Sequence, residues 1–458
     1  MRVAVDIPVK VFEGLRQSSR QRGLPLEQPV TAALRWRRPS RCSRQPPRNN
    51  RTIRAETIVL GISTIFAFPD IRWTRFSLEH VAEQLEAKMS VDLARGTTSS
   101  LDELLNRITV EGLTSFDRVD VDLGRLTLLV GPNGAGKSNF IGAFELLGAI
   151  QRQELSSYVT RAGGANALLH RGESRADHIR IEAHFESNAY EVILEPTADD
   201  DLFFSSEIAK FQGPGRKRPF TESLGSGHRE SKLRGWGSGV PGWVDRVIQN
   251  WVVHHFHDTS RRSPMKATGD IGNNERLQAD GSNLAALLYR MSEARDPDYG
   301  RIVDAIRLVA PFFDDFNLRP DPVNDSLIRL EWTQRSSTSI FGPDTLSDGT
   351  LRFICIATLL LQPKPPSLIL LDEPELGLHP FAIHQVADML ASSDRQIILS
   401  TQSVTLLNQM AIDDVLVAEN QGGHTTLQRP SLDGLEEWLE IYSVGEMWEK
   451  SFLGGRPR

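Results

Sequence analysis

Cysteine is almost absent from this sequence, because its 458 residues include only two. Two cysteines cannot build a disulfide framework or a four-cysteine zinc site, so we expect a reduced, cytoplasmic setting. Long apolar runs are also missing. The longest, at 58–68, has 11 residues and is too short to cross a bilayer as a helix. No secretory signal is visible near the first residue, and no membrane partner is expected.

Charge is unevenly distributed along the chain. The net charge is −7, yet residues 1–88 hold 16 Lys and Arg against 8 Asp and Glu, and the remainder carries −15. The Arg- and Pro-rich stretch at 35–54 lacks apolar periodicity and is typical of disorder. We expect residues 1–104 to be a basic, disordered extension, or sequence translated upstream of a start at Met89. A nucleic-acid-binding arm is the alternative.

A regular pattern begins after residue 105. Alternating apolar residues at 107–123 predict two strands. The apolar run at 125–130 predicts a buried central strand, and helical spacing follows at 139–150. We therefore expect residues 105–458 to form the folded body.

The remaining elements divide into two groups. Residues 151–345 are expected to form an inserted lobe of mixed structure, with antiparallel strands at 178–187 and 189–196 and a glycine-rich, loop-like segment at 210–239. After this lobe, strands alternate with helices. The strands are expected at 367–371, 395–401 and 414–420, with a helix at 380–393. This alternation predicts an α/β fold with a doubly wound, mainly parallel sheet.

The strongest motif is GPNGAGKS, which fits the P-loop pattern and lies between a predicted strand and a predicted helix. Its glycines let the backbone wrap around phosphates, and the helix N-terminus adds partial positive charge. Lys137 is expected to reach the β- and γ-phosphates of ATP, and the Ser138 hydroxyl to bind Mg²⁺. The predicted nucleotide contacts are Gly131, Pro132, Asn133, Gly134, Ala135, Gly136, Lys137, Ser138 and Asn139.

A second motif, SLILLDEPE, delivers two adjacent carboxylates to the edge of the sheet where ligands bind in open α/β folds. Asp372 is expected to hold the Mg²⁺ shell. Glu373 is expected to act as the general base that polarises the attacking water. The two motifs together predict a Mg²⁺-dependent ATPase.

A third motif, LSDGT at 346–350, precedes the strand expected at 367–371. Together with LLDEPELGLHP it resembles the signature of RecF/SMC-like ABC-type ATPases, the branch of RecF, RecN and OLD-type proteins. The resemblance implies an ABC-type P-loop head in which Ser347, Asp348 and Gly349 contact the ATP of a second protomer. It therefore implies an ATP-dependent homodimer. Asp348 and Thr350 depart from the transporter consensus.

Further positions are read from the same resemblance. Gln402, in STQS, occupies the place of the usual switch histidine and is expected to sense the γ-phosphate or position water; it cannot become charged near pH 7. The ELGLHP segment corresponds to a loop that crosses the dimer interface, where His379 is expected to be structural. Gln151 and Gln153 are weak candidates for the Q-loop glutamine.

Two polar segments remain. HHFHD at 254–258 suggests a metal site, but no further ligand motif follows, so we expect ordinary buried packing for His255 and His257. Residues 210–236 contain seven Lys and Arg against two acids, and are either a DNA-contacting surface or a solvated loop.

The resemblance leaves the biological role open between two classes. One is DNA repair or genome maintenance, with DNA as partner. The other is the ATPase sensor of an anti-phage or toxin-type defence module that acts through an effector protein. A transporter subunit is disfavoured, because the large insert and the LSDGT variant do not match that branch. No nuclease motif is recognised after the head.

Overall fold

The computed structural model describes residues 103–172, 176–212, 219–431, 438 and 441–454. The predicted N-terminal extension, apart from its last two residues, lies outside this range, as does Met89. Within the described part, no helix combines the length and the apolar content needed to cross a membrane.

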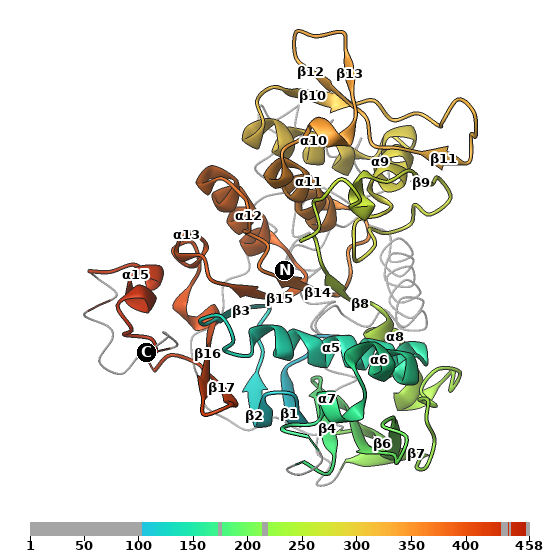
Figure 1. Cartoon of the computed structure of the whole chain (residues 1–458), viewed down its shortest axis with the longest axis vertical. Coiled ribbons are helices and arrows are strands. Elements are labelled where there is room, and N and C mark those ends of the chain that lie inside the picture. The colour runs from blue at the N-terminus through green and yellow to red at the C-terminus, as the bar shows by residue number, and fades with distance from the viewer. Residues whose placement is uncertain (1–102, 173–175, 213–218, 432–437, 439–440, 455–458) are drawn as a thin grey trace, which may run out of the picture. The chain divides into compact units, whose positions relative to one another are not determined.

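The central element is a six-stranded sheet with the order β17-β16-β3-β15-β14-β8 (Figure 1). All neighbouring pairs are parallel except β16 and β17. The strands are β3 (Leu126–Val130), β8 (Trp251–His254), β14 (Leu368–Asp372), β15 (Gln396–Thr401), β16 (Val415–Gln421) and β17 (His424–Gln428). The predicted α/β fold with a mainly parallel sheet is confirmed.

A second six-stranded sheet is antiparallel and has the order β2-β1-β4-β5-β6-β7. Its strands are β1 (Arg107–Leu113), β2 (Phe116–Asp122), β4 (Ile179–His184), β5 (Asn188–Pro196), β6 (Leu202–Phe211) and β7 (Phe220–Gly225). The loop expected at 210–239 was wrong in part, because β7 pairs with β6 across this segment. The chain can pair there because Phe220 and Thr221 supply strand-forming residues between the glycine-rich turns.

Apolar side chains cover both faces of the parallel sheet, which explains the uninterrupted apolar runs of its strands. Leu128 faces one core and Leu129 the other, as alternation along a strand requires. One core contains α9 (Leu284–Glu293), α10 (Pro297–Val309), α11 (Asp348–Leu361), α12 (Pro380–Ser392) and α13 (Val404–Leu407). The other contains α5 (Lys137–Arg152), α6 (Leu155–Ala162), α7 (Ala165–Leu168), α8 (Gly239–Gln249) and the antiparallel sheet.

Residues 151–345 contribute to several parts of this architecture. They supply four strands of the antiparallel sheet and the edge strand β8 of the parallel sheet. They also supply α9, α10 and two small sheets beside them (Figure 1). Those small sheets contain β9 (Gly269–Asp270) with β11 (Leu327–Ile328), and β10 (Phe313–Phe316) with β12 (Trp332–Gln334) and β13 (Ile340–Phe341).

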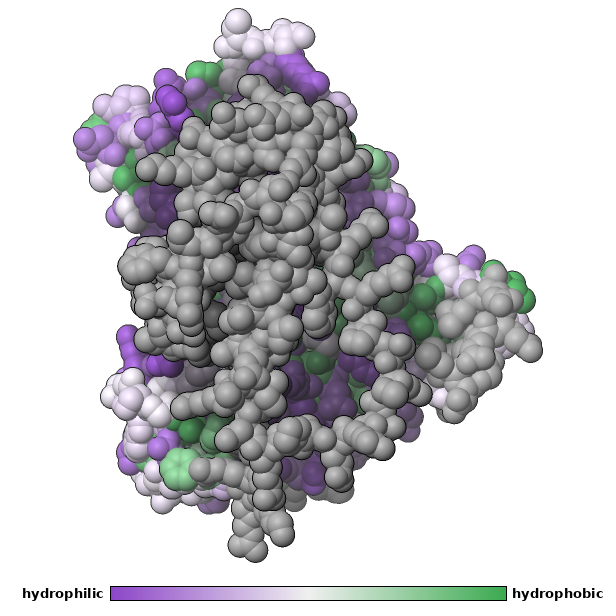
Figure 2. All heavy atoms as spheres, turned by 180° about the vertical axis from the view of Figure 1, so that it is seen from behind, coloured by the Kyte–Doolittle hydropathy of each residue, from purple (hydrophilic) through white to green (hydrophobic). Residues whose placement is uncertain are grey.

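The C-terminal helix α15 (Val444–Glu449) begins with a capping box, in which Ser443 and Glu446 satisfy each other's backbone N–H groups. Met447 anchors it in the core that contains α13. The face in Figure 2 mixes hydrophilic and hydrophobic residues, and the hydrophobic ones visible on its described part form separate small groups. Scattered apolar groups of this kind are normal on protein surfaces.

Candidate functional site

The predicted phosphate loop, 131–136, connects the central strand β3 to α5. Gly136 occupies the N-cap position with φ +98°, a left-handed conformation that favours glycine. No side chain caps the helix, and its first turn holds no acidic residue. The first N–H groups of a 16-residue helix are thus left for an anion, which is the arrangement that binds phosphate.

Lys137 begins this helix and is buried. Its ammonium donates to the carbonyl oxygens of Gly131, at 2.8 Å, and Pro132, at 3.1 Å. Burial lowers the pKa of Lys137, and the negative charges of Glu373 and Asp372 oppose that shift. The ammonium is therefore held over the loop and close to the carboxylates.

Asp372 is the last residue of β14 and joins the two predicted motifs. Its Oδ2 accepts a hydrogen bond from the Ser138 hydroxyl at 3.2 Å, and Ser400, on β15, donates to its Oδ1. Hydroxyl and carboxylate oxygens are the ligands that Mg²⁺ prefers, so Ser138 and Asp372 fit the predicted metal. Residues from β14, from β15 and from the helix that follows β3 converge here, because the carboxyl ends of parallel strands meet at one edge.

Glu373 follows in a left-handed conformation, with φ +42°, which is uncommon for a residue with a side chain. Its backbone N–H donates to the backbone oxygen and the hydroxyl of Ser400, each at 3.1 Å. Gln402 donates through its amide to Oε1 of Glu373. The structure thus brings the predicted base and the predicted γ-phosphate sensor into direct contact.

Glu375 also belongs to the site, although the sequence did not single it out. It is buried, and its Oε1 accepts hydrogen bonds from the Thr401 hydroxyl at 2.6 Å and the Gln402 N–H at 3.0 Å. Burial raises the pKa of Glu375. Its contacts hold the segment after β15, and therefore Gln402, against the end of β14.

The signature residues lie at the start of α11. Ser347 caps this helix by accepting from the Thr350 N–H at 3.1 Å, and Asp348 lies 3.6 Å from the ammonium of Lys266. A side chain at Gly349 would meet the carbonyl oxygen of Gly377 at 2.3 Å, so the signature helix packs directly on the ELGLHP segment. Across the described residues, no hydrogen bond or ion pair links the signature residues to the phosphate loop.

The histidine cluster differs from the expectation. His254 is buried, and burial lowers its pKa to about 3, but His255 and His257 are exposed rather than packed in a core. The reason is the parallel register of β8 with β14, which pairs His254 with Leu371. The residues after His254 therefore emerge at the same edge as Asp372.

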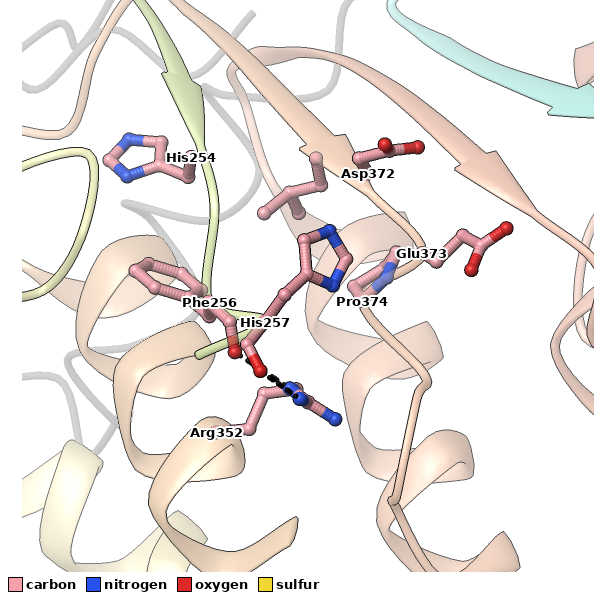
Figure 3. Close-up of a pocket in the computed structure, with 8 residues that line it drawn as sticks. His254, Phe256, His257, Arg352, Asp372, Glu373 and Pro374 are labelled. Carbon is pink, nitrogen blue, oxygen red and sulfur yellow. Dashed lines mark hydrogen bonds between the residues drawn. The ribbon is translucent and has the colours of Figure 1, made fainter. Parts of the chain in front are cut away.

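His257 and Asp372 line one small pocket, together with Glu373 and Arg352. Figure 3 shows the His257 ring pointing toward the two carboxylates. Arg352, from α11, donates to the carbonyl oxygens of Phe256, at 2.9 Å, and His257, at 3.1 Å, which fixes this loop. The HHFHD pattern singles out His257 only as part of a cluster and does not predict it at this pocket, because its place depends on which strand neighbours β14.

His255 does not line this pocket, because its ring forms a hydrogen bond with Glu145 of α5 at 2.7 Å. This hydrogen bond raises the pKa of His255. The two exposed histidines thus have different surroundings, and only His257 lines the pocket.

The two glutamines considered for the Q-loop are bound elsewhere. Gln151 donates to Asp245 at 2.8 Å and Gln153 to the carbonyl oxygen of Ser231 at 3.0 Å. Both lie at the far end of α5, and a rise of 1.5 Å per residue puts Gln151 about 20 Å from Ser138. Neither can reach the phosphate site.

Part of the basic stretch at 210–236 is already paired. The Lys210 ammonium lies 2.8 Å from Glu182 and 2.5 Å from Glu191. Arg229 pairs with Asp199 and Asp201. Three of its other basic residues, 216–218, lie outside the described residues. These ion pairs reduce the positive charge that the stretch can offer to DNA.

Comparison with known proteins identifies the class. Residues 126–408 match the family described as "AAA domain, putative AbiEii toxin, Type IV TA system". This range covers more than half of the chain and includes the phosphate loop, the signature motif and Gln402. The chain belongs to this family, and the predicted relationship to RecF/SMC-like ABC-type ATPases is confirmed.

Two curated proteins are similar to this chain over part of their length. The chain is 23% identical over 393 residues to the Old nuclease of Escherichia phage P2, across 74% of this chain and 62% of that protein. It is 32% identical over 146 residues to an ABC transporter ATP-binding/permease protein of Mycobacterium tuberculosis, across 28% of this chain and 16% of that protein. The chain therefore spans less than two thirds of either relative.

Similar solved structures include an Smc head bound to the C-winged helix domain of ScpA. It shares 14% identity at a TM-score of 0.49, across 74% of this chain and 99% of that chain. The Smc head domain of Thermotoga maritima shares 14% identity at a TM-score of 0.35, across 71% and 99%.

Proposed function

We propose that residues 105–458 form an ATPase head that binds ATP with Mg²⁺ and hydrolyses it. The observation that carries this proposal is the convergence of Ser138, Asp372, Glu373 and Gln402 at one sheet edge, beside an uncapped helix N-terminus. Membership of an ATPase family supports it. The test is phosphate release from Mg²⁺–ATP, and a chain that binds no ATP would overturn the proposal.

Each residue has a distinct part in this reaction. The N–H groups of 134–138 and the Lys137 ammonium bind the phosphates, and Lys137 offsets charge that develops on the γ-phosphate. Ser138 and Asp372 would hold Mg²⁺, which supplies Lewis-acid stabilisation when bound.

The remaining polar groups act on water. Glu373 accepts a proton from the attacking water, and the Gln402 amide orients that carboxylate by donating to Oε1. His257 faces the same carboxylates and orients the water or a phosphate oxygen by hydrogen bonding.

We further propose that two chains form a head-to-tail nucleotide sandwich. Ser347 and Asp348 are exposed, and the signature makes no bonds to the phosphate loop of its own chain within the described residues. The N-terminus of α11 is therefore available to the ATP of a second copy. ATP would then act as a switch on dimerisation, because a ligand stabilises the state that binds it.

Light scattering tests the sandwich. Glu373→Gln with saturating Mg²⁺–ATP should have the mass of a dimer, because it binds ATP without consuming it. The double variant Lys137→Ala/Glu373→Gln is the matched control and should stay monomeric. A monomer for Glu373→Gln, under conditions where ATP binding is measured directly, would refute the sandwich.

Two cellular roles are proposed for this switch. The first is DNA repair or genome maintenance, in which DNA is bound by the dimer. The second is the ATPase of an anti-phage or toxin-type defence module that acts through an effector protein. The family description favours the second, and the ion pairs of Lys210 and Arg229 weaken the first.

Turnover measured with and without duplex DNA separates the two roles. Stimulation by DNA that Lys232→Ala/Arg234→Ala abolishes would support the first role. Turnover that does not respond to DNA would support the second.

A further inference from the structure

The signature helix carries an acid at the end where the proposed sandwich places a phosphate. Asp348 is the first residue of α11 and directly follows its N-cap residue, Ser347. The Asp348 side chain is 65% exposed, so its carboxylate faces any ligand that approaches this end of the helix. The N–H groups of a helix N-terminus attract an anion, but a carboxylate beside them repels it. A phosphate is therefore accepted here only if a cation offsets the charge of Asp348.

A buried cation lies next to this carboxylate. The Lys266 ammonium is 3.6 Å from Oδ1 of Asp348, and the Lys266 side chain is only 7% exposed. The same ammonium donates to the carbonyl oxygen of Thr259 at 2.6 Å. Among the described residues, no other Lys, Arg or His lies within ion-pair distance of Asp348. A buried ammonium costs free energy unless a negative group compensates it, so the two side chains offset each other's charge.

The segment that carries Lys266 is fixed against the signature helix. Lys266 ends a short 3-10 helix, η1 (Pro264–Lys266), which Ser263 caps by accepting from the Met265 N–H. Met265 packs against α11, where the Cys355 thiol lies 3.1 Å from its sulfur. Both sulfur-containing side chains belong to the buried core that contains α11. This packing holds the ammonium beside the start of α11 without relying on the ion pair itself.

We propose that Lys266 is a positioning residue of the signature, whose ammonium offsets the charge of Asp348 so that the N-terminus of α11 accepts the triphosphate of a second copy's ATP. This role rests on the proposed sandwich and adds a residue that the signature motif does not contain. Lys266 acts through Asp348 and not on the phosphates themselves, because its own side chain is buried. Loss of Lys266 should therefore weaken dimerisation and spare ATP binding at the phosphate loop of the same chain.

The test measures the dimer dissociation constant by analytical ultracentrifugation in saturating Mg²⁺–ATP, with Glu373→Gln as the parent protein. Lys266→Gln/Glu373→Gln should have a dimer dissociation constant about tenfold higher than the parent, because each interface then opposes an uncompensated carboxylate to phosphate. ATP affinity, measured at protein concentrations below that constant, should be the same in both proteins.

Removal of the carboxylate should reverse the loss. Lys266→Gln/Asp348→Asn/Glu373→Gln carries neither charge, so its dimer dissociation constant should return to within about threefold of the parent. A packing defect caused by the loss of Lys266 would not be repaired by Asp348→Asn, so the rescue separates charge compensation from folding. Lys364→Gln/Glu373→Gln is the matched control, because Lys364 is an exposed lysine just beyond the other end of α11, and it should dimerise like the parent.

The outcomes distinguish Lys266 from the sandwich. Equal dimerisation with and without Lys266, or a loss that Asp348→Asn does not reverse, would overturn the role of Lys266 and leave the sandwich standing. A Glu373→Gln parent that binds ATP and stays monomeric would overturn the sandwich itself, and the role of Lys266 with it.

Discussion

Carboxylates have opposite surroundings in the two six-stranded sheets. On the antiparallel sheet, Glu182 and Glu191 both contact Arg180 and Lys210. At the edge of the parallel sheet, Asp372, Glu373 and Glu375 reach no cation within ion-pair distance among the described residues. Their partners are hydroxyl, amide and backbone groups instead.

The difference follows from strand direction. Antiparallel neighbours bring residues from distant segments face to face in pairs, so charges of opposite sign can neutralise one another across the strands. Parallel strands end together, so polar residues that follow them collect at one edge without a cation opposite each carboxylate. Unpaired carboxylates cost free energy unless they serve another ligand, and this cost is typical of functional sites.

The largest effect is expected from Lys137→Ala. This change removes the cation that we propose binds the phosphates, so ATP affinity should fall by about 100-fold or more. Calorimetry with Mg²⁺–ATP measures it. The control is Lys210→Ala, which removes a cation of the antiparallel sheet and should leave ATP affinity unchanged. Equal losses in the two variants would mean that the cations do not differ in role.

Glu182→Gln tests the paired carboxylates. The hydrogen bond from His184, with Lys210 adding to it, lowers the pKa of Glu182 to about 2. A lowered folded-state pKa means that the charged form stabilises the fold above the ordinary pKa of glutamate. Glu182→Gln should therefore cost about 1–3 kcal/mol of unfolding free energy at neutral pH.

The pH dependence of that cost has a defined sign. It should be complete above pH 4.5, the ordinary value, and disappear as the pH falls toward 2. Urea titrations of both proteins at several pH values measure it. A cost that does not change with pH would show that packing, not charge pairing, accounts for the loss.

His257→Ala should slow turnover about tenfold without weakening ATP binding, because His257 faces the carboxylates and not the phosphate loop. His257→Gln should retain most of the rate, since an amide also donates and accepts hydrogen bonds. His255→Ala is the neighbouring control and should keep the wild-type rate. A slower rate in all three variants would indicate that turnover depends on the conformation of the loop that holds His255 and His257, and not on the imidazole of His257.

The smallest effect is expected from Glu375→Gln, and its sign is opposite to that of Glu182→Gln. Burial raises the pKa of Glu375, so the fold loses stability as the pH rises from the ordinary value of 4.5, where the unfolded chain ionises first, to that raised pKa. Gln still accepts from Thr401 and Gln402, so unfolding free energy should rise by up to about 1 kcal/mol at neutral pH. The gain should vanish in acid, where Glu375 is protonated in both states. Thermal melts across pH measure it, and a loss of stability at neutral pH would contradict the assignment.

The sequence predicted those parts of the site that depend on neighbouring residues in the chain. The strand before Gly131, the helix from Lys137 and the strand ending at Asp372 all follow from local apolar patterns, and each was found. Gln402 lies at the same edge because it directly follows β15, a strand that the local apolar pattern predicted.

The features that the sequence missed depend on contacts between distant segments. His257 reaches the pocket because β8 pairs with β14, a register that no local pattern specifies. Lys210 was counted among the basic residues of 210–236, and its partners, Glu182 and Glu191, lie on other strands that the local count did not include. Glu375 was passed over because only the folded chain buries it.

The carboxylates of the two sheets are compared most directly by measuring ATP affinity and phosphate release for Glu373→Gln. This substitution removes the charge of one unpaired carboxylate and keeps its shape, so ATP affinity should remain within a few-fold of wild type while phosphate release falls by about 100-fold or more. That result would identify the parallel-sheet edge as the place of hydrolysis. Phosphate release at the wild-type rate, with ATP bound equally well, would contradict it.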